Sequence, residues 1–336
     1  MYVIYAIIAF SVLIIVHELG HFTMAKLNNV MVEEFSLGMG PKLYGIQGKE
    51  TKYLIKAFPI GGYVKMLGDE GASTDPRAFN NKKPIQKLSI VIAGPIMNLI
   101  LGVILFAMVS GFKGYYTPVI DKLTDNGPAK TAGLLPGDKL LKINSTKILT
   151  WEDFATDVYT SNGKPVTITY SRNNKVSTMS ITPVKDVEQN RYMVGIYPTE
   201  VTSPSIIQSI NYGMNESVSL TKQTAGFFKT LFTGKASMND FGGPVTIIKY
   251  SGAAAKAGII TLMSFSAYIS IQLAIFNIIP FPALDGGYIF LYLFEIITGR
   301  KVDDNKVGII NYFGFAVLMM LMVIVTIKDI IYPINI

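Results

Sequence analysis

Two histidines and a glutamate stand close together in the sequence His17-Glu18-Leu19-Gly20-His21, and they are the only histidines among the 336 residues. On a helix, residues four apart lie on one face, one turn above the other, so both imidazoles can bind one zinc ion. Glu18, next to the first ligand, is suited to accept a proton from zinc-activated water. The pattern predicts a catalytic zinc site with Glu18 as its general base.

The chain around this motif has the composition of a membrane protein. Half of its residues are hydrophobic and only 16% are charged, against about 25% charged in a typical soluble domain. The apolar residues form blocks that approach the ~20 residues needed to cross a membrane. Ionisable side chains inside such a block are costly and mark a functional site by default. Four spans are predicted, at about 2–27, 88–112, 259–279 and 307–327.

A catalytic zinc ion takes three protein ligands and keeps one position open. The chain has no cysteine and no further histidine, so the third ligand must be a carboxylate. The best candidate is Asp285, which follows two prolines and precedes two glycines in the stretch 277–287. Non-helical backbone at membrane depth is tolerated only where it is buried in protein or lines a cavity. Asp285 is therefore the expected third ligand, with Glu295 in reserve, and the expected cofactor is one zinc ion.

Basic residues predict how the chain is oriented. Lys and Arg are concentrated between the first two spans and in the last connection, and none precedes the first span. By the positive-inside rule both connections are cytoplasmic, whereas both termini and the segment 113–256 lie outside. The net charge of +7 is then explained by topology and anionic membrane lipid, and no nucleic-acid partner is expected. The apolar start, with no basic residue before it and no cleavage site, favours a retained span over a removed signal peptide.

The segment after the second span has a different character. Short alternating strands such as 166–170 and 178–183 predict a small β-rich domain, followed by an amphipathic helix at about 203–234. One stretch resembles the signature of PDZ domains, which bind extended peptides along a sheet edge; its matching residues are Leu134, Gly137, Asp138, Leu140, Leu141, Ile143 and Asn144. The expected division is a first membrane half (1–112), a PDZ domain (113–186), a linker with the amphipathic helix (187–255) and a second membrane half (256–336).

The connection between the first two spans holds further motifs. The stretches 42–47, 51–58 and 62–67 have the pattern of short strands, and several are too apolar for a free hairpin. A membrane-associated β-loop at about 35–67, on the cytoplasmic side, is therefore expected. The zinc motif and the Asn-x-x-Pro-x-Pro-x-Leu-Asp-Gly-Gly stretch at 277–287 together resemble the site-2 protease family, in its bacterial RseP-type form with a single PDZ domain. The stretches 58–66, 93–98 and 241–245 agree with this resemblance.

The resemblance implies a role for each matching residue. His17, His21 and Asp285 would bind zinc, and Glu18 would be the general base. Asn98 and Asn277 would lie near the scissile peptide. The edge of the β-loop would receive the substrate as an extended strand, through Gly61, Gly62, Tyr63, Val64, Lys65 and Met66.

The expected function is that of an intramembrane zinc endopeptidase in a bacterial plasma membrane, with its active site towards the cytoplasmic side. By resemblance, its substrates are single-span proteins already trimmed outside, such as anti-sigma factors or remnant signal peptides. The PDZ domain would exclude substrates with bulky outer domains.

Two other functions remain as alternatives. A PDZ-bearing scaffold without catalysis would have no use for the base Glu18, which the chain retains. A zinc or proton transporter would also place ionisable groups inside a membrane. The peptide-binding module and the lack of repeated halves argue against a transporter.

Overall fold

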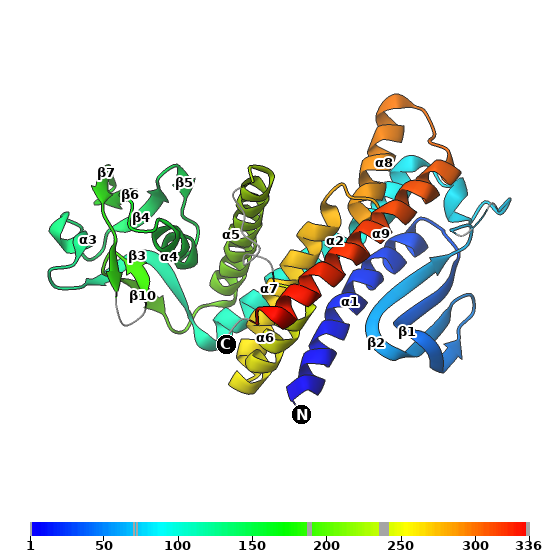
Figure 1. Ribbon diagram of the computed structural model, residues 1–336, viewed down its shortest axis with the longest axis horizontal. Helices are drawn as coiled ribbons and strands as arrows, with labels where there is room; N and C mark the ends of the chain where they lie inside the picture. The colour runs from blue at the N-terminus through cyan, green and yellow to red at the C-terminus, as the bar shows by residue number, and fades with distance from the viewer. Residues whose placement is uncertain (1, 70, 72, 187–189, 235–241, 334–336) are drawn as a thin grey trace. The chain divides into compact units, whose positions relative to one another are not determined.

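The computed structural model describes residues 2–69, 71, 73–186, 190–234 and 242–333. The chain divides into two compact units, the first made of residues 1–105 and 223–336 and the second of residues 106–222 (Figure 1). All residues predicted to take part in the zinc chemistry belong to the first unit.

Four helices of the described chain are long and apolar enough to cross a membrane. They are α1 (Tyr2–Leu27), α2 (Pro84–Lys113), α7 (Ile259–Ile278) and α9 (Asp304–Ile331). Each coincides with one expected span, so the prediction of a multi-pass helical membrane protein is confirmed. α2 begins at a proline, whose fixed φ suits the first turn of a helix. α7 ends just before Pro280, which cannot continue it.

The first unit contains a helix in a stretch where the sequence analysis expected none. This is α6 (Pro244–Ala257), which lies partly in the stretch expected to be a linker. It contacts α1, α7 and α9. Small side chains let helices approach closely, but they form no apolar stripe that periodicity could detect. The buried residues of α6 are of this kind, namely Thr246, Ser251, Ala254 and Ala255.

Three further helical elements belong to the described chain outside the PDZ-like region. α5 (Ile206–Phe232) covers the stretch where an amphipathic helix was expected. α8 (Asp285–Thr298) begins at the predicted third ligand. A single 3-10 turn, η1 (Phe79–Asn81), precedes α2.

The β-loop is a sheet of two long, bent strands, β1 (Val32–Gln47) and β2 (Lys52–Met66). Residues 34–37 pair with 62–65 in opposite order and with 52–55 in the same order, and 42–47 pairs with 52–56. Because each strand folds back, the sheet has four passes, with 62–66 at one edge and 42–47 at the other. A left-handed glycine, Gly61 with φ 89°, makes the bend just before the 62–66 edge.

The second unit contains the PDZ-like region and its β-sheet. The order of its strands is β10-β3-β4-β6-β7, with β5 paired to β4, and a separate pair joins β8 to β9. β10 lies in the stretch expected to be a linker, yet it pairs with β3. The bounds are β3 (Tyr115–Leu123), β4 (Lys139–Ile143), β5 (Thr146–Lys147), β6 (Val166–Arg172), β7 (Lys175–Ile181), β8 (Val184–Asp186), β9 (Arg191–Met193) and β10 (Ile196–Val201).

Two short helices, α3 (Pro128–Thr131) and α4 (Trp151–Thr160), pack with this sheet. The core between them is apolar and fully buried, with Leu134, Ile143, Phe154 and Ile168 among its members. The signature residue Asp138 is buried and accepts two hydrogen bonds of 2.7 Å from the Arg172 guanidinium. A bidentate pair of this type fixes the turn before β4.

Candidate metal centre

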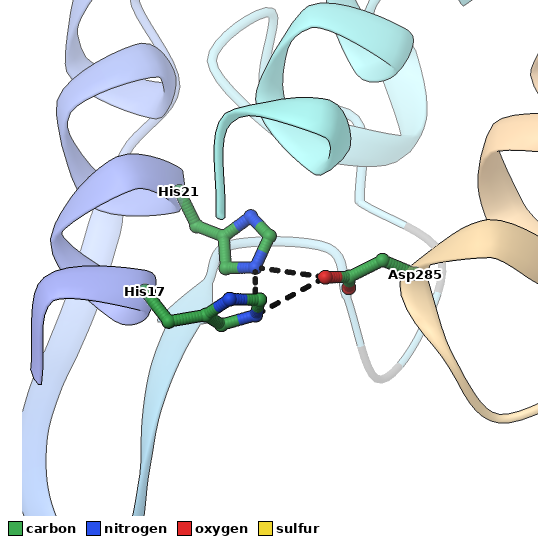
Figure 2. A group of neighbouring side chains, drawn as sticks. All are labelled: His17, His21 and Asp285. Atoms are coloured by element: carbon green, nitrogen blue, oxygen red, sulfur yellow. Dashed lines mark hydrogen bonds and ion pairs between the residues drawn. The ribbon is translucent and has the colours of Figure 1, made fainter. Parts of the chain in front are cut away.

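Figure 2 shows three side chains that meet at one point, His17 and His21 from α1 and Asp285 from the start of α8. The Nε2 atoms of the two histidines lie 3.2 Å apart. The Oδ2 atom of Asp285 lies 3.1 Å from His17 Nε2 and 3.5 Å from His21 Nε2. Within the described residues, no other group of His, Cys, Asp and Glu side chains has the spacing of a metal site.

The spacing of the three atoms fits a zinc ion. Ligand atoms about 2.0–2.1 Å from a tetrahedral zinc lie roughly 3.3 Å from one another, and the observed separations run from 3.1 to 3.5 Å. In the described part of the chain, the buried Oδ2 atom of Asp285 has no hydrogen bond of good geometry. A bound cation would compensate that oxygen. With three protein ligands, a fourth position stays open for water or substrate.

Each imidazole has a second partner on the side facing away from Asp285. His21 Nδ1 lies 2.9 Å from the carbonyl oxygen of Ile90 on α2. An N–H donated to that carbonyl leaves the lone pair of Nε2 free for a metal. His17 Nδ1 lies 3.3 Å from the side-chain amide of Asn98, and the backbone carbonyl of Asn98 accepts a hydrogen bond from Ser270 on α7. Asn98, expected near the scissile peptide, is fully buried against His17.

Two glycines allow α1 and α2 to pack closely around the histidines. A Cβ atom on Gly94 of α2 would lie 2.5 Å from His21 Cε1 and 2.8 Å from His17 Cε1. A Cβ atom on Gly20 of α1 would lie 2.7 Å from the carbonyl carbon of Ala93. Since real Cβ contacts are not this short, both positions require glycine. The two imidazoles therefore rest directly on the backbone of α2.

The loop before α8 fixes Asp285, the expected third ligand. A Cβ atom on Gly286 would lie 2.5 Å from the carbonyl oxygen of Ile278, and one on Gly287 would lie 2.7 Å from that of Phe281. The loop is tight because the Phe281 carbonyl also accepts a hydrogen bond from the backbone N–H of Leu284. The Leu-Asp-Gly-Gly motif thus folds the start of α8 back onto the end of α7, and Asp285 projects from the first turn of α8.

Glu18 and Asn277 were also predicted as site residues, and they differ in what they contact. Glu18 is half-buried on α1, and a Cβ atom on Gly62 would lie 3.2 Å from its Cγ atom. The 62–66 edge of the β-loop therefore passes beside the expected base. Asn277 is half-buried near the end of α7, without a hydrogen bond to the three ligands among the described residues.

The reserve ligand Glu295 is not brought to the histidines. It lies near the other end of α8, where its Oε1 accepts a hydrogen bond from the backbone N–H of Val302. Ten residues of helix, at 1.5 Å each, separate it from Asp285 by roughly 15 Å along α8. Only one of the two carboxylates considered for the third position thus lies at the histidines.

Comparison with known proteins agrees with this geometry. A family model described as peptidase family M50 matches residues 5–321. A Clostridium acetobutylicum protein, provisionally described as a zinc metalloprotease, is 52% identical over 99% of this chain and 98% of its own length. A Clostridium perfringens protein with the same provisional description is 47% identical over 99% and 100% of the two chains. The regulator of sigma-W protease RasP of Bacillus subtilis is 28% identical over 98% of each.

One solved structure is also similar to part of the chain. It is the PDZ domain of an SdrC-like protein from Listeria monocytogenes, 19% identical, with a TM-score of 0.23, covering 26% of this chain and 88% of its own. With the M50 model spanning most of the sequence, the chain belongs to peptidase family M50 and is a multi-pass membrane zinc metalloprotease.

Proposed function

We propose that this metalloprotease hydrolyses peptide bonds within or at the edge of the membrane, using one zinc ion held by His17, His21 and Asp285. The observation that carries the proposal is the set of ligand-atom separations, 3.1, 3.2 and 3.5 Å. The two histidines lie in α1, a helix with the length and composition of a membrane span. A substrate bond cut at this site must therefore reach membrane depth.

Glu18 is the proposed general base. Zinc bound at this site would supply Lewis-acid chemistry, polarising the peptide carbonyl and making water more acidic. Glu18, adjacent to His17 on α1, is placed to accept a proton from the attacking water and to pass it to the leaving amine. The Ile90 carbonyl and the Asn98 amide hold the two imidazoles in orientation. Both contacts give these groups a positioning role at the metal centre, and Asn98 is also a proposed contact to the substrate backbone.

The 62–66 edge of the β-loop is the proposed binding edge for the substrate. A helical peptide hides its bonds, whereas an extended peptide added to a sheet edge exposes them. Gly62 lies next to Glu18, so a strand paired along Gly61, Gly62, Tyr63, Val64, Lys65 and Met66 would run past the base. Tyr63 is held in place because its hydroxyl donates to Glu34 and accepts from Lys56. Asn277 is the proposed contact to the substrate backbone.

The proposed substrates are single-span membrane proteins that have lost their outer domains. The Bacillus subtilis relative is named as a regulator of sigma-W protease, which favours anti-sigma factors, with remnant signal peptides as a second class. The bacterial relatives favour a bacterial plasma-membrane location, and the distribution of Lys and Arg supports an orientation with the site towards the cytoplasm. The PDZ-like region has a cavity of about 770 Å³ between α4 and β10. A peptide segment of the substrate would bind in this cavity or be excluded from it.

The test is cleavage of a tagged single-span substrate without its outer domain by the purified full-length protein. Wild type, Glu18→Gln and the control Glu33→Gln are compared, with zinc measured in each. We expect about one zinc per chain in all three and cleavage by wild type and the control only. Cleavage by Glu18→Gln at the wild-type rate would refute the proposed mechanism. Absence of cleavage in all three would favour the scaffold, and zinc flux into vesicles would favour the transporter.

A further inference from the structure

Asn311 on the last membrane helix, α9, is bound to the segment that carries Asp285. Its side-chain oxygen accepts a hydrogen bond of 3.1 Å from the backbone N–H of Ala283. Its side-chain nitrogen donates a hydrogen bond of 2.8 Å to the hydroxyl of Tyr288. Ala283 precedes Asp285 and Tyr288 follows it on the first turn of α8. One amide therefore fixes the chain on both sides of the third ligand.

The backbone at Ala283 needs such support. Its φ of 70° lies in the left-handed region, where the Cβ atom of an L-residue crowds the following carbonyl group. A residue other than glycine stays in this region only when its surroundings hold it there. The hydrogen bond from Ala283 to Asn311 supplies that restraint. It also satisfies a backbone N–H that would otherwise be left without a partner at membrane depth.

A second residue of α9 contacts the same loop. A Cβ atom on Gly314, one turn after Asn311, would lie 2.5 Å from Pro282 Cβ and 2.7 Å from the Pro282 carbonyl oxygen. Most of α9 is otherwise exposed, with 6% of its most apolar stretch buried. A polar amide within such a helix is typical of a specific contact between helices. The contact of α9 with the loop before α8 is therefore close and polar.

From these contacts we propose that Asn311 is a positioning residue for the metal centre. It holds the strained turn at Ala283, and through that turn it places the Asp285 carboxylate opposite His17 and His21. The inference rests on the proposed role of Asp285 as a zinc ligand. In this arrangement α9 contributes no ligand of its own, yet it determines how firmly zinc is held.

The test measures zinc affinity rather than proteolysis. Full-length protein in detergent is titrated with a chelator of known affinity, using wild type, Asn311→Leu and Asn305→Leu. The second variant is the matched control, since Asn305 is an exposed asparagine on the same helix. We expect Asn311→Leu to raise the Kd for zinc about tenfold, as loss of an outer partner of a metal ligand does. Asn305→Leu should leave the Kd unchanged.

A double variant separates positioning from a general loss of packing. Glycine adopts the left-handed conformation without the Cβ penalty, so Ala283→Gly should recover part of the zinc affinity in the Asn311→Leu background. If Asn311→Leu does not fold, Gly314→Ala displaces the same loop and should also raise the Kd. Wild-type affinity in Asn311→Leu would overturn the inference, as would a weakened site that Ala283→Gly leaves unchanged.

His17→Ala is measured in the same titration. Its loss of zinc would uphold the proposed metal site whatever Asn311→Leu shows. Retention of wild-type affinity by His17→Ala would refute that site, and the positioning role of Asn311 with it.

Discussion

Replacing Gly94 by alanine should weaken the metal centre while the membrane helices stay folded. The new Cβ atom would lie 2.5 Å from His21 Cε1, whereas ordinary contacts begin at 3.4 Å. The imidazole of His21 must therefore withdraw by about 0.9 Å, or α2 must move by a similar distance. A metal site tolerates ligand displacements of only about 0.2 Å. A misplacement of roughly 1 Å near reacting groups costs on the order of 100-fold in rate.

The assay for Gly94→Ala combines zinc content with kcat/KM on a single-span substrate. We expect a loss of about 100-fold in kcat/KM and zinc below one equivalent after dialysis. Gly252→Ala on α6 is the matched control, because a Cβ atom there meets nothing within 4 Å. Zinc content and kcat/KM within threefold of wild type in Gly94→Ala would refute the reasoning, since the imidazoles would then not rest on α2.

Three further predictions follow from other sites. Gly286→Ala should destabilise the protein by about 1–3 kcal/mol through overpacking and lose zinc, as thermal unfolding and metal analysis would show; unchanged values would contradict the loop geometry. Gly62→Ala, whose Cβ would lie 3.2 Å from Glu18 Cγ, should lower kcat but retain zinc; equal loss of both would count against a role beside the base. Burial raises the pKa of Glu216 to about 8. As the pH rises, the unfolded chain therefore loses the Glu216 proton at a lower pH than the folded protein does. The stability of the second unit should then be greatest below about pH 4 for this group and fall as the pH rises to about 8; Glu216→Gln should flatten this dependence in thermal unfolding followed by Trp151, the single tryptophan.

The meeting of His17, His21 and Asp285 was predictable because its signal is local or follows from the scarcity of other candidate ligands. His17 and His21 are one helical turn apart, and no other histidine competes with them. Asp285 followed from the need for a carboxylate and from prolines and glycines that break a span. The four membrane helices were equally accessible, since apolar length alone indicates them. In each case a short stretch of sequence is enough to make the prediction.

What the sequence did not reveal depends on contacts between distant segments. Gly94 is required by imidazoles on another helix, and the contact of Asn98 with His17 joins residues far apart along the chain. The pairing of β10 with β3 and the four passes of the β-loop are matters of register, which no local pattern specifies. α6 was not predicted because its buried face is made of small side chains. The roles of these residues become visible only when the elements are assembled.

The separation of the ligands along the chain has a consequence for the time at which the protein becomes active. His17 and His21 belong to the first membrane helix, whereas Asp285 belongs to α8. During synthesis, a ribosome that has delivered α1 to the membrane must still translate most of the chain before the third ligand exists. Two histidines alone form an incomplete site. On the proposed ligand set, a nascent or truncated chain that stops before α8 could not cleave its neighbours in the membrane, and proteolytic competence would arrive only near the end of translation.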